Sequence, residues 1–180
     1  MNKQNYLKIE VGLNRDARWY MTLRRRLKAA GINVNWLPGS FHITVAFMND
    51  DTHKEQLKTI FGNIIRQHPA PQLKFNKLDA FTSKNSRQHI VNLTSTCASE
   101  EFTALVNQLR TAAIKVGANP EDYRLHVTLG KIQGDAANLE TILRILSTIE
   151  IKPFTLTLNK AKYKYFRGDD IASWDFGVAH

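Results

Sequence analysis

Cysteine is nearly absent from the chain, which has a single one, Cys97, among its 180 residues. One cysteine excludes an intrachain disulfide and any zinc site built from several thiolates. Long apolar runs are also missing, since no segment approaches the ~18 consecutive apolar residues of a membrane helix. The first residues, MNKQNYLKIEVGL, lack the apolar core of a signal peptide. The sequence therefore predicts a cytoplasmic protein without a membrane partner.

Acidic residues are outnumbered by basic ones. Asp and Glu total 16 against 25 Lys and Arg, which gives a formal net charge of +9. Such an excess favours anionic partners, namely nucleotides, nucleic acid or an acidic surface, although surplus lysine can also serve solubility alone. Hydrophobic residues make up 43% of the chain, enough for a packed core, so the composition excludes a wholly disordered protein.

No linker rich in Pro, Gly or Ser divides the chain, and its apolar residues alternate between strand and helix periods. The order strand, helix, strand, helix, strand is predicted twice. The first set is expected at residues 7–13, 16–30, 41–48, 57–65 and 73–81. The second set is expected at 89–96, 99–116, 124–132, 139–149 and 154–166, followed by a short strand near 174–178.

Matched spacings indicate that the two sets arose by internal duplication. Equivalent positions recur with a period near 84 residues, and the dipeptide Asn-Lys appears at both 76–77 and 159–160. Solenoid repeats are shorter than this, so the period predicts two related lobes. We expect repeats of roughly 6–86 and 87–178, related by a pseudo-two-fold axis that brings equivalent strands to one cleft.

The duplicated strands share the pattern His-x-Thr followed by an apolar residue. The copies are His42-Ile43-Thr44-Val45 and His126-Val127-Thr128-Leu129. Residues two apart on a strand face the same side, so each strand would present an imidazole and a hydroxyl together. One such tripeptide can arise by chance, and a lone strand histidine is usually a core residue. Two copies at matched places of a repeat favour a functional site.

Two imidazoles and two hydroxyls without a carboxylate suit an anion better than a cation. A phosphoryl group can accept hydrogen bonds from all four side chains. In-line displacement at phosphorus needs an entering and a leaving group on opposite sides, and two histidines can serve as general base and general acid. The motifs hold no metal-ligand set. The sequence therefore predicts phosphoryl chemistry at His42, Thr44, His126 and Thr128, with no metal and no cofactor.

These motifs resemble the signature of the 2H phosphoesterase superfamily, especially its bacterial 2′-5′ RNA ligase-like, cyclic phosphodiesterase branch. The resemblance spans nearly the whole chain. Phe47 occupies the aromatic position after the first motif, and Arg124 matches the arginine before the second. The sequence departs from the family pattern where Lys131 replaces an arginine, where Leu125 replaces a proline, and where Met48-Asn49 replaces Leu-Gly.

The resemblance implies a single bilobal α+β domain over residues 1–180, with an antiparallel-rich sheet and two helices in each lobe and the active cleft between them. It implies metal-free hydrolysis of 2′,3′-cyclic phosphates or 2′-5′-linked phosphodiesters. By analogy, His42 would protonate the leaving ribose oxygen and His126 would activate water, although the reverse assignment remains open. Thr44 and Thr128 would orient the phosphate and stabilise developing charge.

Five further residues are candidates for substrate binding. Arg124 precedes His126 by two positions, so it is either a phosphate clamp or a surface ion-pair partner. Strand alternation alone places Lys131 on the opposite face from His126, although its side chain could reach the cleft rim. In the superfamily, aromatics near Phe81, Tyr163 and Tyr165 can stack on a base, and the alternative for all three is packing.

The expected function is therefore that of a phosphodiesterase, acting on nucleotides or RNA ends as a monomer. Three alternatives remain at this stage. The first is 2′-5′ RNA ligation, the second is hydrolysis of cyclic oligonucleotide signals, and the third is an RNA-binding module that performs no catalysis. The last would not require a paired acid and base, so the presence of both histidines and both threonines disfavours it.

Overall fold

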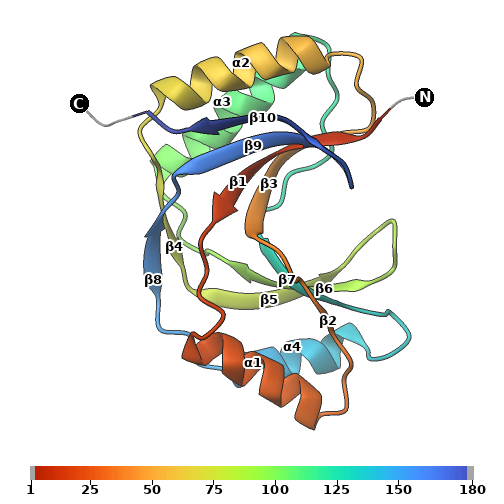
Figure 1. Cartoon of the computed structure of the whole chain (residues 1–180). Helices are drawn as coiled ribbons and strands as arrows, with labels where there is room; N and C mark the ends of the chain where they lie inside the picture. Colours follow the sequence, from red (N-terminus) through yellow and green to blue (C-terminus); the bar gives the residue numbers. More distant parts are fainter. Residues whose placement is uncertain (1–2, 178–180) are drawn as a thin grey trace.

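The computed structural model describes residues 3–177, which form ten strands and four helices (Figure 1). The helices are α1 (Arg18–Ala29), α2 (Lys54–Gln67), α3 (Glu100–Lys115) and α4 (Leu139–Ser147). The strands are β1 (Asn5–Val11), β2 (Asn35–Trp36), β3 (Phe41–Met48), β4 (Gln72–Phe75), β5 (Lys77–Thr82), β6 (His89–Thr94), β7 (Val127–Ile132), β8 (Phe154–Thr157), β9 (Lys160–Tyr165) and β10 (Asp170–Asp175). No helix in this part of the chain has the length and apolar character needed to cross a bilayer.

Most strands belong to one antiparallel sheet, with the order β10-β9-β1-β3-β7-β6-β5 and β2 paired to β7. Helices α2 and α3 lie against the β10-β9-β1-β3 part, and α1 and α4 lie against the β7-β6-β5 part (Figure 1). Each lobe therefore has an antiparallel sheet covered by two helices on its outer side. The predicted bilobal α+β fold is confirmed.

The lobes draw their elements from both halves of the chain. Helix α1 directly follows β1, yet it packs with α4 in the other lobe (Figure 1). Helix α3 comes from the second half of the chain and packs against β3 and α2 from the first half. The spatial lobes thus differ from the sequence repeats at 6–86 and 87–178, which remain a prediction about the origin of the sequence.

Two predicted strands are each divided at the repeated Asn-Lys dipeptide. The segment 73–81 forms β4 and β5, with Asn76 between them, and the segment 154–166 forms β8 and β9, with Asn159 between them. Strands β4 and β8 leave the main sheet and pair with each other, along the left side of Figure 1. The Asn76 side chain stabilises its break by hydrogen bonds with Thr96 at 2.7 and 2.9 Å.

The predicted end signals of α1 and α3 are present in the structure. The Ser99 hydroxyl caps α3 by accepting a hydrogen bond from the Phe102 amide at 3.1 Å, a cap that is typically worth about 1 kcal/mol. Gly31 and Gly117 end α1 and α3 with φ angles of +74° and +94°, which glycine adopts at low cost. The final strand ends at Asp175, earlier than the predicted 174–178, and residue 178 lies outside the described residues.

Candidate active site

The two His-x-Thr strands are direct neighbours in the sheet. Strands β3 and β7 are antiparallel and are joined at Ile43 and Val127, the central residues of the two motifs. Both central side chains are fully buried, while the histidines and threonines beside them are only partly buried. In an antiparallel pair the residues flanking a matched pair also lie across from each other. The structure therefore brings the four predicted catalytic residues together, on the face of each strand opposite the core.

A β-bulge follows each motif. Across from β1, the register passes from Thr44 to Ala46, so Val45 is the extra residue in β3. Across from β6, it passes from Thr128 to Gly130, so the second bulge lies between these two residues of β7. In both strands the two residues after the threonine are buried and the next one is not. The bulges therefore reverse the strand alternation at equivalent positions.

The bulges move two side chains to the side of the histidines. Phe47 lies 6.0 Å from the ring of Tyr6, which in turn lies 5.8 Å from the ring of His42. Lys131 is the equivalent residue of β7 and is exposed, between buried Gly130 and buried Ile132. The prediction that Lys131 lies on the opposite face from His126 is therefore wrong, because simple alternation does not include the bulge.

His126 is held by the segment that leads into β7 and by an aromatic neighbour. Its Nδ1 lies 2.8 Å from the Arg124 carbonyl, which can only accept, so Nδ1 donates and Nε2 is left to act on a substrate. The Phe81 ring is perpendicular to the imidazole at 5.0 Å, and the Arg124 guanidinium lies over that ring at 4.1 Å. Phe81 and Arg124 are thus gathered around His126.

Burial lowers the pKa of His126 below 6.5. The Arg124 carbonyl opposes this effect by stabilising the imidazolium, and the positive charge of the Arg124 side chain adds a further lowering.

The surroundings of His42 disfavour a positive charge on its imidazole more strongly than those of His126 do. Burial lowers its pKa from 6.5 to about 4, with further lowering by Lys8, His126 and Lys164, in that order. The Ser40 carbonyl opposes these effects, but among the described residues no hydrogen bond is completed to the buried Nδ1 of His42. At neutral pH, the unliganded protein therefore holds His42 as a neutral imidazole.

The charges around His42 come from strands β1 and β9. Lys8 lies across from Thr44 and Glu10 lies across from His42 in the β1–β3 register, and Lys8 also lies across from Lys162 of β9. Sequence reasoning missed these groups. The alternation of Lys8 and Glu10 within a predicted strand was available as a signal, but the pairing of that strand with the first motif was not.

Two of the predicted base-stacking residues lie elsewhere. Tyr163 is fully buried, donates a hydrogen bond from its hydroxyl to Asn5 Oδ1 at 2.6 Å, and packs edge-on against Phe61 of α2. Tyr165 points to the same side of β9 and accepts a hydrogen bond from Lys54 of α2 at 2.9 Å. The stacking prediction is wrong for both, because this face of β9 is turned toward α2 and away from the histidines.

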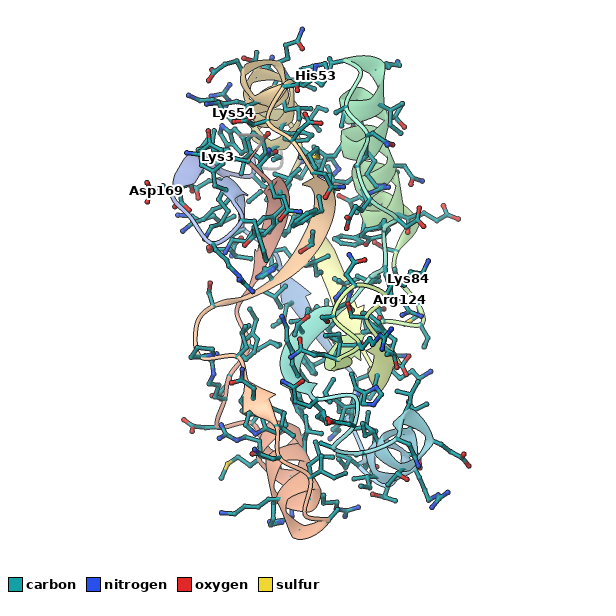
Figure 2. All side chains as sticks on the ribbon, turned by 90° about the vertical axis from the view of Figure 1, so that its right-hand side faces the viewer. Lys3, His53, Lys54, Lys84, Arg124 and Asp169 are labelled. Carbon is teal, nitrogen blue, oxygen red and sulfur yellow. The ribbon has the colours of Figure 1, made fainter. Side chains whose placement is uncertain are left out.

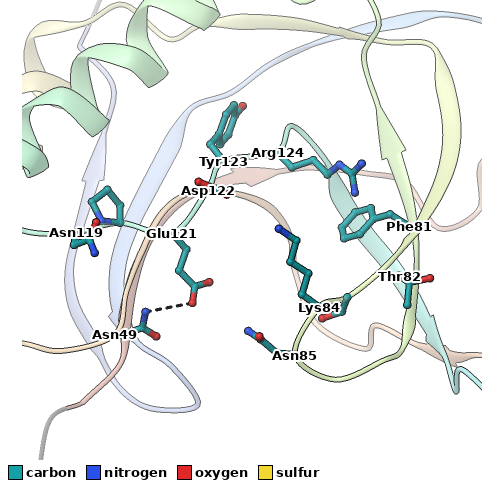
Figure 3. Close-up of a pocket in the computed structure, with 12 residues that line it drawn as sticks. Asn49, Phe81, Thr82, Lys84, Asn85, Asn119, Glu121, Asp122, Tyr123 and Arg124 are labelled. Atoms are coloured by element: carbon teal, nitrogen blue, oxygen red, sulfur yellow. Dashed lines mark hydrogen bonds between the residues drawn. The ribbon is translucent and has the colours of Figure 1, made fainter.

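A pocket of about 750 Å³ lies beyond Phe81, between the β5–β6 hairpin and residues 119–124 (Figure 3). Figure 2 shows Lys84 and Arg124 close together at this side of the molecule. Glu121 accepts a hydrogen bond from the Asn49 amide at 3.3 Å on the opposite wall. The pocket is lined by Asn49, Phe81, Thr82, Ser83, Lys84, Asn85, Asn119, Pro120, Glu121, Asp122, Tyr123 and Arg124. Phe81 and Arg124, which contact His126, therefore also line this pocket.

Sequence comparison identifies the family of this chain. The 2′-5′ RNA ligase superfamily matches residues 39–161, which is more than half of the chain and includes both motifs. The chain belongs to the 2′-5′ RNA ligase superfamily. The predicted resemblance to the 2H phosphoesterases is thereby confirmed. No curated protein matches the chain.

Solved structures share the superfamily fold over nearly the whole chain. Escherichia coli LigT complexed with NADP+ has 16% sequence identity and a TM-score of 0.60, with 98% of this chain and 99% of that chain covered. The protein TT0787 of Thermus thermophilus has 10% identity and a TM-score of 0.63, with coverage of 98% and 100%. Usb1 of Kluyveromyces marxianus has 10% identity and a TM-score of 0.60, with coverage of 98% and 99%. At these identities the likeness shows the fold.

Proposed function

We propose that this superfamily member is a monomeric phosphodiesterase that hydrolyses 2′,3′-cyclic phosphates or 2′-5′-linked phosphodiesters of nucleotides and RNA ends by two-histidine acid/base catalysis. The observation that carries the proposal is the pairing of Ile43 with Val127, which sets the two His-x-Thr motifs side by side on one face. In the described residues no three or more His, Cys, Asp or Glu side chains are gathered to hold a metal ion. The proposed chemistry needs only the four motif side chains.

The environments of the two histidines favour one assignment of roles. Burial, together with the charges of Lys8 and Lys164, keeps His42 neutral, so His42 is suited to accept a proton from the attacking water. The Arg124 carbonyl stabilises protonated His126, which is suited to give its proton to the leaving ribose oxygen. This assignment is the reverse of the one implied by the family resemblance.

The proposed step balances in atoms and charge. Water attacks phosphorus as its proton passes to His42, the bond from phosphorus to the ribose oxygen breaks, and that oxygen takes a proton from His126. The Thr44 and Thr128 hydroxyls donate to the phosphate oxygens that gain charge in the transition state. The product of a 2′,3′-cyclic phosphate is then a phosphomonoester beside a free hydroxyl.

A nucleotide substrate is supported by the fold relatives. Solved structures of Escherichia coli LigT include complexes with 3′-AMP and with phosphate. In this chain, the pocket next to His126 offers the Phe81 ring and the Arg124 and Lys84 cations, which suit a nucleoside attached to the reacting phosphate.

The decisive experiment is product analysis on a panel of substrates: 2′,3′-cyclic mononucleotides, 2′-5′-linked oligoadenylate and cyclic dinucleotides. We expect hydrolysis of at least one of the first two classes and identify the product isomer by chromatography against 2′- and 3′-phosphate standards. Turnover confined to cyclic dinucleotides would replace the proposal by a signal hydrolase. RNA binding without turnover of any substrate would replace it by a binding module.

A further inference from the structure

Three lysines lie on the face of the sheet that carries the motifs, and two of them, Lys8 and Lys164, are close enough to His42 to act on its charge. We call Lys8, Lys162 and Lys164 the lysine cluster. Lys8 lies across from Thr44 on one side and from Lys162 on the other, and Lys164 lies across from Tyr6, the residue whose ring is next to His42. These three cations take no direct part in the proton transfers assigned to the two histidines.

The acidic groups of this region neutralise only one member of the lysine cluster. Lys162 forms ion pairs with Glu10 at 3.4 Å and with Asp170 at 3.6 Å. Within residues 3–177, no carboxylate lies within 4.0 Å of the Lys8 or Lys164 ammonium group. In the described part of the chain, Lys8 and Lys164 therefore have no ion-pair partner next to the proposed phosphate site.

Lys8 is the more informative of these two. Only 6% of its surface is exposed, which is exceptional for lysine. Burial and the nearby charge of Lys164 both lower its pKa, while Glu10 and Asp170 act in the opposite direction. Among the described residues, Lys8 Nζ is not one of the fully buried atoms that lack a hydrogen-bond partner, so the ammonium group reaches solvent while the rest of the side chain is buried. From this position the ammonium can bind an anion on the face that carries the motifs.

We propose that Lys8 and Lys164 form a subsite for a second phosphate of the substrate, beside the phosphate that the two motifs hold. This inference rests on the proposed phosphodiesterase function and narrows its substrate class to nucleotides that carry at least one phosphate besides the reacting one. Ammonium groups bind phosphate as compact point charges, and the two strands place both on the His42 side. The ends of oligonucleotides meet this requirement, whereas 2′,3′-cyclic mononucleotides do not.

A kinetic comparison tests the subsite. The substrates are adenosine 2′,3′-cyclic phosphate and the same nucleotide with an added 5′-phosphate, measured at pH 7 and low salt. We expect the wild type to have the higher kcat/KM for the two-phosphate substrate. Lys8→Met should lower the ratio of the two kcat/KM values by about ten- to a hundredfold, the range of a charged hydrogen bond. Lys164→Met should lower it in the same direction.

Lys160→Met is the matched control. Lys160 lies in β9, two residues from Lys162, and is paired with Asp175 at 3.8 Å. Its replacement removes the same charge from β9, the strand of Lys164, so the substrate ratio should be retained. An equal fall of the ratio in Lys160→Met would overturn the subsite, because it would attribute the preference to general charge.

Binding measurements separate the subsite from the proposed reaction. Calorimetric titration with adenosine 3′-phosphate and adenosine 3′,5′-bisphosphate needs no turnover. We expect tighter binding of the bisphosphate to the wild type and loss of this preference in Lys8→Met and Lys164→Met, with unchanged circular dichroism. Equal wild-type affinities would overturn the subsite even if hydrolysis were established. A preserved bisphosphate preference without any turnover would support the subsite and refute the phosphodiesterase assignment.

Discussion

The two motif histidines share the His-x-Thr pattern and flank the same matched pair, Ile43 and Val127, but they face different surroundings. His126 has its Nδ1 on the Arg124 carbonyl and its ring against Phe81, beside a pocket of about 750 Å³. His42 lies near Lys8 and Lys164, and its Nδ1 has no hydrogen-bond partner among residues 3–177. In the proposed function the side of His126 would hold the nucleoside, and in the proposed subsite the side of His42 would hold additional negative charge. A duplicated motif can acquire two roles when the neighbouring strands differ.

The largest expected effect comes from removing either histidine. We expect His42→Ala and His126→Ala each to lower kcat by at least ~10²-fold, because each supplies one of two coupled proton transfers. The double variant should lose little more than either single variant, since the two groups act as a unit. The kcat of each variant is measured by steady-state hydrolysis of whichever panel substrate the wild type turns over.

The control for the histidine variants is His53→Gln, a half-buried histidine at the start of α2 that belongs to neither motif. It should retain wild-type turnover and stability. Hydrolysis at the wild-type rate by His126→Ala would refute the two-histidine mechanism.

The threonines should have smaller effects than the histidines. We expect Thr44→Val and Thr128→Val to lower kcat/KM by about tenfold each, because each removes one hydrogen bond to a charged phosphate oxygen. The proton transfers remain, so the pH profile should keep its shape. Initial-rate kinetics over pH provide both readouts, and a loss equal to that of the histidine variants would assign the threonines a different role.

The pH dependence sharpens the difference between the histidines. If His42 is the base, kcat/KM should rise with pH through a pKa of about 4, and it should fall as His126 loses its proton below the ordinary value of 6.5. The optimum for free enzyme should therefore be acidic. Bound phosphate stabilises imidazolium, so the kcat profile should lie at higher pH.

Lys8→Met tests the assignment of the acidic limb to His42. Loss of this nearby cation should raise the pKa of His42, so the acidic limb should move to higher pH by a fraction of a unit to about one unit. The alkaline limb should not move. A shift of the alkaline limb alone would exchange the roles of the two histidines.

The smallest expected effect is that of chelation. We expect EDTA to leave kcat and KM unchanged, since the proposed step uses only protein side chains on both sides of the phosphate. Rates are measured after dialysis against EDTA, with and without added Mg²⁺ or Mn²⁺. Activity that disappeared in EDTA and returned with either ion would contradict the proposed mechanism.

Local pattern was enough to predict most elements and the residues that carry the proposed chemistry. Helical periodicity gave α1 to α4 within a few residues, since one apolar stripe and its end signals lie in a single segment. Period-two alternation predicted that the histidine and threonine of each motif point to the same side, because that relation depends only on the local extended backbone.

Contacts between distant segments determined which other side chains lie next to the two motifs. Lys131 lies on the side of His126 because of a bulge, which exists only where β7 meets β6 in an irregular register. Tyr163 is buried because α2 covers that side of β9, and its own strand pattern does not contain this information. The cations beside His42 come from strands that precede and follow it by long stretches of chain. Sequence thus determined which groups each strand presents, and tertiary packing determined which groups meet, because strand pairing and bulges are properties of two segments rather than of one.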